Sequence, residues 1–98
     1  AGYSKCVRLP NGNLYAGGTT LAAHTVERIG LAVAVERAKE EDDSWEGYDA
    51  WILHDENADK LSSSKELEVE GGYYYRVVST HSANDDMTDS FTDGVFIE

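Results

Sequence analysis

The clearest pattern along the chain is an alternation of apolar positions with a period of two residues. Ile29, Leu31, Val33 and Val35 follow this period, which is typical of a strand with one buried face. The same region is rich in Ala, Leu, Glu and Arg, which favour helices. However, Gly30 would interrupt a helix, and no N-cap box precedes the apolar positions. We therefore predict a strand rather than a helix for residues 20–38, although the pattern does not decide between helix, strand and loop for residues 20–28.

Other short segments carry the same strand signals, separated by residues that favour turns. "YSKCVRL" alternates and is followed by "PNGN" at 10–13, which supplies Pro, Asn and Gly for a reversal. The aromatic-rich stretch 45–51 predicts a strand with a bulge at Gly47, and "KELEVE" at 65–70 predicts a half-buried strand. Turn signals recur every 8 to 12 residues or so along the chain. This pattern predicts an all-β fold, a small immunoglobulin-like antiparallel β-sandwich of about seven strands.

The stretch "GGYYYRVVSTHS" at 71–82 places three tyrosines directly after two glycines. Val69, Tyr75 and Val77 have the spacing of an inward residue and a following tyrosine across an interstrand corner of immunoglobulin-like sandwiches. We expect Tyr73 or Tyr75 to bury its ring and return its hydroxyl to nearby backbone, while the glycines permit a sharp turn.

Tyr74, Arg76 and Val78 then point away from the core and form a candidate contact surface. Tyr and Arg combine a large contact area with directional polar groups, which suits a binding hot spot. An alternative is that the pair only covers the sheet and neutralises a glutamate of 66–70 across the strands. The binding prediction comprises Tyr74, Arg76, Val78, Trp45, Tyr48 and Trp51, with one of the two tryptophans partly at the surface.

These motifs resemble a known group of proteins. "VEGGYYYRVVSTHS", "DSFTDGVFI" and the upstream "VAVERAKEEDDSWEGYDAW" are similar to an uncharacterised family of small secreted proteins of Gram-positive bacteria, with its "sW…W" stretch and "GyxYRV…tHs" strand. The resemblance covers roughly residues 28–97. It implies secretion and an immunoglobulin-like or fibronectin-like sandwich, and it implies no activity.

Length and charge narrow the classes of partner. A chain of 98 residues has apolar surface for one core, so residues 1–98 are expected to form a single domain. The net charge of −11 repels phosphate backbones and anionic headgroups, so we expect no nucleic-acid partner. The longest apolar run, "LAVAV" at 31–35, is far below the roughly 20 residues that cross a bilayer, so we expect no membrane insertion.

The small residue Ala1 at the start fits a processed, exported protein, and we expect an extracellular location.

The single cysteine, Cys6, cannot form an internal disulfide. We interpret it as a small apolar side chain of an early strand. The alternative is a disulfide between two molecules in an oxidising compartment.

An acidic stretch matches part of a calcium-loop template. Asp55, Asn57, Asp59 and Glu66 occupy positions 1, 3, 5 and 12, where oxygen ligands wrap a hard cation. Lys60 stands where the turn requires Gly, so a solvated loop joining two strands is the alternative. The sequence predicts no other cofactor, and a second acidic cluster at 84–89 is interpreted as a polar hairpin loop.

No pattern predicts catalysis. The histidines at 24, 54 and 81 are dispersed, and no nucleophile motif accompanies them. We therefore expect a secreted, non-catalytic binding or surface-interaction module rather than an enzyme. The alternatives are an extracellular self-assembling subunit with an open edge at residues 3–9 or 91–97, and a calcium-stabilised adhesive domain.

Overall fold

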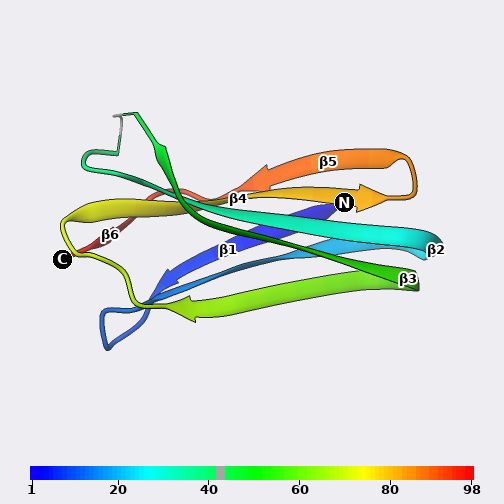
Figure 1. Ribbon diagram of the computed structural model, residues 1–98, viewed down its shortest axis with the longest axis horizontal. Coiled ribbons are helices and arrows are strands. Elements are labelled where there is room, and N and C mark those ends of the chain that lie inside the picture. The colour runs from blue at the N-terminus through cyan, green and yellow to red at the C-terminus, as the bar shows by residue number, and fades with distance from the viewer. Residues whose placement is uncertain (42–43) are drawn as a thin grey trace.

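The computed structural model describes residues 1–41 and 44–98, and these form strands and turns without a helix (Figure 1). The strands are antiparallel neighbours. Their bounds are β1 Gly2–Arg8, β2 Leu14–Ala38, β3 Glu46–Leu67, β4 Tyr73–Ala83, β5 Asp86–Phe91 and β6 Val95–Ile97. The all-β prediction is confirmed. Residues 20–28, which the sequence left open, belong to β2.

Two layers arise because the long hairpin of β2 and β3 bends over. The pairing of β2 with β3 shifts register between Leu21 and Val26, and Asn57 on the opposite strand has a φ of 53°. The first half of β2 pairs with β1, and its second half pairs with β4. Within the described residues, a single sheet of six strands therefore curls over itself. The strand number is below the expected seven because β2 and β3 each serve both layers.

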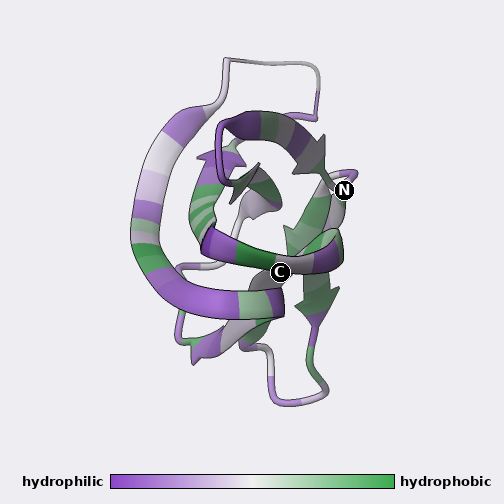
Figure 2. Cartoon of the chain, turned by 90° about the vertical axis from the view of Figure 1, so that its right-hand side faces the viewer, coloured by the Kyte–Doolittle hydropathy of each residue, from purple (hydrophilic) through white to green (hydrophobic). Residues whose placement is uncertain are grey.

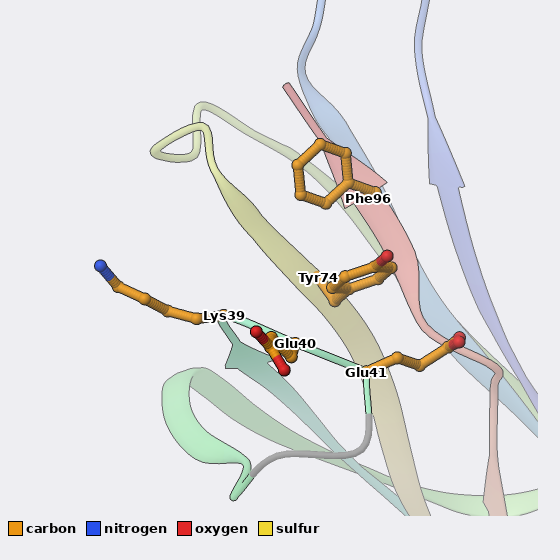
Figure 3. Close-up of a pocket in the computed structure, with 5 residues that line it drawn as sticks. All are labelled: Lys39, Glu40, Glu41, Tyr74 and Phe96. Carbon is orange, nitrogen blue, oxygen red and sulfur yellow. The ribbon is translucent and has the colours of Figure 1, made fainter.

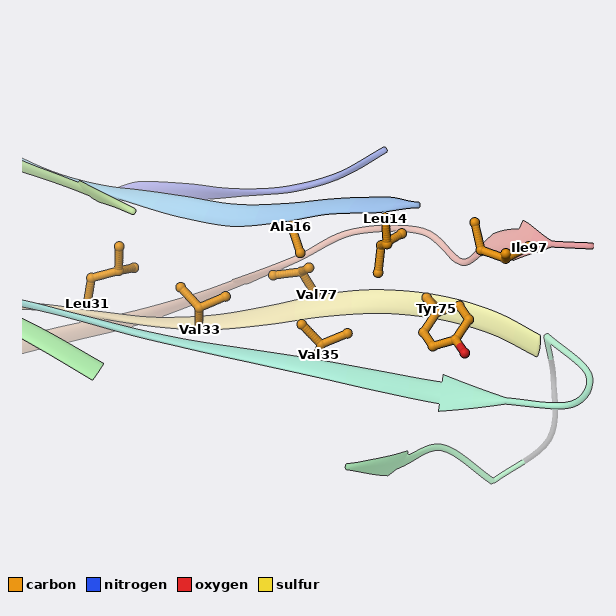
Figure 4. Packing of buried hydrophobic residues seen from close by; sticks show 8 residues of the cluster. All are labelled: Leu14, Ala16, Leu31, Val33, Val35, Tyr75, Val77 and Ile97. Atoms are coloured by element: carbon orange, nitrogen blue, oxygen red, sulfur yellow. The ribbon is translucent and has the colours of Figure 1, made fainter. Parts of the chain in front are cut away.

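The core lies between the two layers. Leu14 and Ala16 of the first half of β2 face Leu31, Val33 and Val35 of its second half (Figure 4). Seen end-on, the strands curl around this interior (Figure 2). The alternating apolar residues that predicted a strand therefore form the buried side of β2. Burial of each large aliphatic side chain stabilises the fold by about 1.5–3 kcal/mol.

The corner before β4 has the expected tyrosine arrangement. The Tyr75 ring is fully buried, and its hydroxyl donates to the Glu70 carbonyl oxygen at 2.5 Å. Gly72 has a φ of 89° and its N–H donates to the Ile97 carbonyl oxygen. The prediction that a tyrosine returns its hydroxyl to backbone here is confirmed.

A chain of polar side chains also joins the layers. Ser4 of β1 hydrogen-bonds Ser79 of β4 at 2.8 Å and Ser90 of β5 at 2.6 Å. Ser90 lies 2.7 Å from His81 Nε2, and His81 Nδ1 lies 2.8 Å from the Thr20 hydroxyl of β2. Among the described side chains, no buried polar atom lacks a hydrogen-bond partner.

Three local predictions have clear outcomes. A bulge lies in the expected stretch, but the additional residue is Tyr48 and not Gly47, because Gly47 pairs with Glu36 and the β2–β3 register shifts between Val35 and Glu36. The loop expected at 55–66 is wrong, since these residues lie within β3. The strand expected at 65–70 ends at Leu67. Charged residues are tolerated in β3 because it lies at an edge of the sheet, where alternate side chains and main-chain groups face solvent. Of the charge run at 39–43, Asp42 and Asp43 lie outside the described residues.

Candidate interaction surface

The outer side of the layer formed by β3, β2, β4 and β5 carries several large apolar side chains. Small residues of β2 form the centre of this side. Ala32 pairs with Ile52 of β3 and with Thr80 of β4, and Ala34 pairs with Val78 of β4. Val78 in turn pairs with Phe91 of β5. The exposed fractions are 67% for Ile52, 68% for Met87, 74% for Phe91 and 39% for Phe96. We call the set Ile52, Tyr74, Val78, Met87, Phe91 and Phe96 the outer-face patch.

Arg76 lies within this surface in a fixed position. Its Nε donates to Glu36 Oε1 at 2.7 Å, and its guanidinium lies 4.3 Å from the centre of the Trp45 ring. Glu36 is the cross-strand neighbour of Arg76 on β2, so the expectation that Arg76 neutralises a glutamate of 66–70 is wrong. The two contacts leave the guanidinium ordered and about one-third exposed, with a side-chain accessibility of 31%.

A hollow lies at the end of the same face, next to Tyr74 (Figure 3). The Tyr74 and Phe96 rings are 4.9 Å apart, and Lys39, Glu40 and Glu41 complete the wall of a cavity of about 670 Å³. Its acidic side chains favour a cationic group over an anionic one.

Two of the six residues predicted for binding lie on the other side of the sheet. Tyr48 packs edge-on against Tyr75, with ring centres 5.6 Å apart. The Trp51 ring packs against the core, and its Nε1 donates to Ser63 Oγ at 3.1 Å. The structure therefore gathers Tyr74, Arg76, Val78 and Trp45 and separates Tyr48 and Trp51 from them. Both tryptophans are half-buried, each on a different face.

The sequence reasoning missed Ile52, Met87, Phe91 and Phe96. The signal for Ile52 was present, because its neighbours Trp51 and Leu53 alternate with it and point inward. Met87 and Phe91 lie in β5, which pairs with β4 through a tight turn at Asn84. That short strand has no alternation of its own, so its exposed apolar residues could not be assigned to a face.

The residues of the calcium template lie along β3 rather than around a loop. Asp55, Asn57 and Asp59 are exposed, and they follow one another along this strand instead of around a loop. Glu66 accepts hydrogen bonds from Asn13 at 2.8 Å and from Asn11 at 3.2 Å, and these bonds hold its pKa below the usual range. Within residues 1–41 and 44–98, no three acidic, His or Cys side chains are grouped so as to hold a metal ion.

His81 is the one histidine in a buried setting among the described residues, at 2% exposed. Burial, followed by the nearby N-terminal ammonium group, lowers its pKa, and Asp89 acts in the opposite direction. The adjacent hollow of about 30 Å³ has room for about one water molecule. The His81–Ser90 contact therefore serves to join the layers.

Comparison with protein-family models, curated proteins and solved structures found no match to this chain. The resemblance to a family of small secreted proteins stays a prediction. In the described part of the chain, no helix has the length and apolar character needed to span a membrane.

Proposed function

We propose that this chain is a non-catalytic binding module that captures a protein partner through the outer-face patch, outside the cell. The observation that carries the proposal is the continuity of exposed apolar side chains from Ile52 across the small residues of β2 to Phe91. Isolated exposed apolar residues are ordinary on a protein surface, whereas a contiguous set that crosses several strands is typical of an interaction site.

Arg76 supplies a polar anchor inside the apolar surface. The Trp45 ring and the Glu36 carboxylate fix its side chain before a partner arrives, so little conformational entropy is lost on binding. Arginine and aromatic residues surrounded by apolar contacts are the usual hot spots of protein interfaces.

Charge indicates the character of the partner. The net charge is −11, and Glu41 and Asp93 line the hollow that contains Trp45, Arg76 and Phe91. A partner with basic residues around an apolar centre would be steered to this face, and an acidic partner would be repelled.

Paired variants test the proposal. The double variant Val78→Thr and Phe91→Ser removes apolar surface from the patch, while Tyr3→Ser removes an apolar ring that is 52% exposed on β1, in the other layer. Each protein is immobilised and exposed to extracellular proteins of the source organism. We expect at least tenfold less captured partner for the double variant, unchanged capture for Tyr3→Ser, and closely similar melting temperatures. Equal capture by both variants, or wild-type capture no greater than that of an unrelated acidic domain, would contradict the proposal.

Self-assembly through the edges expected from the sequence has less support. Those edges belong to β1, β5 and β6, and they lie against each other: Ser4 bonds Ser90, and Arg8 pairs with Glu98 at 3.2 Å. An incoming copy would have to displace these contacts.

A further inference from the structure

One edge of β3 is unpaired in the described part of the chain. β3 pairs with β2 and with no other strand of the described chain. Its register with β2 is regular where Asp49–Asp55 lie opposite Ile29–Val35. The Tyr48 bulge bounds the regular register at one end, and at the other end the register continues to the pair Val26–Ala58 before it shifts.

Two hydrogen bonds identify which main-chain groups face outward. The Ala50 N–H donates to Asp49 Oδ1 at 2.8 Å, and the Glu56 N–H donates to Asp55 Oδ1 at 2.8 Å. These amides are bonded by side chains of their own strand, which indicates that they point away from β2.

The residues between them complete the pattern. Main-chain N–H and C=O groups of a strand alternate sides from one residue to the next, so Ile52 and His54 face the same way as Ala50 and Glu56. The N–H and C=O groups of Ile52 and His54 therefore form a short template for another strand. Each hydrogen bond made there contributes about 1 kcal/mol.

Charge along this edge is unusual for the chain. Residues Ala50–His54 carry no formal charge, and Asp49 and Asp55 stand at the two ends of the run. Exposed edges are commonly protected by lysine, proline or a bulge, and this run contains none of them. The remainder of the β3 edge carries charged residues at both of its ends, from Glu56 to Lys60 and from Lys65 to Glu66.

The two aspartates decide between possible occupants. If a second copy paired antiparallel about Ile52, Asp49 of each copy would lie opposite Asp55 of the other, in a pair of chains that each carry −11. Like charges directly opposite each other destabilise a sheet. A segment with apolar residues between two basic residues meets the same edge with favourable charge at both ends.

We propose that the β3 edge between Asp49 and Asp55 binds an extended, basic segment of the partner protein as an added strand. The proposal rests on the proposed binding function, but it uses main-chain atoms of the edge instead of side chains of the outer-face patch. Ile52 belongs to both surfaces, so a partner bound at the patch lies beside this edge.

A synthetic peptide tests the proposal. The probe is acetyl-Arg-Val-Thr-Val-Thr-Val-Arg-amide, and the comparison peptides have glutamate in place of both arginines or N-methyl groups on alternate amides. Amide hydrogen exchange, followed by NMR, reports where each peptide binds. We expect the arginine peptide to slow exchange at Ile52 and His54 at least fivefold, and the two comparison peptides to leave exchange unchanged.

Variants of Ile52 separate the main chain from the side chain. Ile52→Pro removes the outward N–H and leaves the ladder with β2 intact, since proline is tolerated at edge positions of this kind. Ile52→Thr keeps the N–H and the branched side chain. We expect Ile52→Pro to weaken peptide binding roughly tenfold and Ile52→Thr to change it less than threefold. If Ile52→Pro does not fold, the N-methylated peptide supplies the same comparison with the wild-type protein.

Three results would overturn the proposal. They are equal binding of the arginine and glutamate peptides, exchange protection at β1 or β5 instead of β3, and protection of Ile52 and His54 by protein dimerisation without peptide. The Val78→Thr and Phe91→Ser variant should still bind the arginine peptide. If this variant binds the peptide but does not capture the natural partner, the loss is due to the outer-face patch, and the proposal for the β3 edge is unaffected.

Discussion

The Tyr75 hydroxyl donates a hydrogen bond to the carbonyl oxygen of Glu70, five residues earlier in the chain, at a distance of 2.5 Å. The bond closes the corner through Gly71 and Gly72, and it fixes the start of β4 against the core. Burial also raises the pKa of Tyr75, so the hydroxyl stays protonated and remains a donor at neutral pH.

Replacing Tyr75 with phenylalanine is expected to lower the free energy of unfolding by about 1–1.5 kcal/mol, because the Glu70 carbonyl loses its donor while the ring remains. Tyr74→Phe is the matched control, since the Tyr74 ring packs on Phe96 at the outer face, and we expect a change of less than about 0.5 kcal/mol. Urea denaturation of both variants measures the difference. Equal losses would show that the corner bond does not stabilise the fold.

A second prediction concerns the bend of the β2–β3 hairpin. Asn57 is exposed and has a φ of 53°, a conformation that costs most side chains about 1 kcal/mol and costs glycine nothing. Asn57→Ala should therefore destabilise the protein by about 1 kcal/mol, while Asn57→Gly should be neutral or slightly stabilising. Thermal unfolding of the pair checks this order. The reverse order would mean that the bend does not require the left-handed conformation.

The reactivity of Cys6 gives a third prediction. Burial raises the pKa of its thiol to about 11, and a hydrogen bond with Thr92 acts in the opposite direction. The thiolate is the reactive form, so at pH 8 alkylation by iodoacetamide should be roughly a hundredfold slower in the folded protein than in 6 M guanidinium. Rapid alkylation of the folded protein would show that Cys6 is accessible as a thiolate and would favour the disulfide between molecules.

The sequence predicts the fold class because the two-residue alternation of apolar side chains matches the residues that the fold buries. Between Ile29 and Val35, alternation outweighs the helix preference of Ala, Leu and Glu, since this side of β2 is covered by the other layer. Tyr75 and Val77 are predictable for the same reason. Their corner is a local feature, specified by a few adjacent residues.

Long-range features could not be predicted. "AAHT" at 22–25 interrupts the alternation where the hairpin bends, so nothing in the pattern shows that one strand runs through both layers. The charged residues 55–60 indicated a loop because an exposed strand edge and a loop are equally hydrophilic. The pairing of Arg76 with Glu36 and Trp45 depends on the register between β2 and β4, which single-strand patterns do not contain.

The buried His81 gives the fourth prediction, on pH. Its ring lies between Thr20 and Ser90, the charged groups that act on it are the N-terminal ammonium and Asp89, and Asp86 lines the adjacent hollow. Because burial lowers the pKa of His81 in the folded protein, the unfolded chain takes up a proton first, near its ordinary pKa of about 6.5. The contribution of His81 to stability is therefore complete above that pH and is lost as the pH falls toward the folded-state pKa.

His81→Gln isolates this effect, because glutamine keeps a donor and an acceptor but does not titrate. The variant should be less stable than the wild type at pH 7.5, and its free energy of unfolding should fall less between pH 7.5 and pH 5. The carboxylates titrate in both proteins, so the difference between the two pH profiles reports His81 alone. Parallel profiles from urea denaturation would mean that the imidazole is protonated equally readily in the folded and unfolded chain, and that the polar link between the layers tolerates a charge.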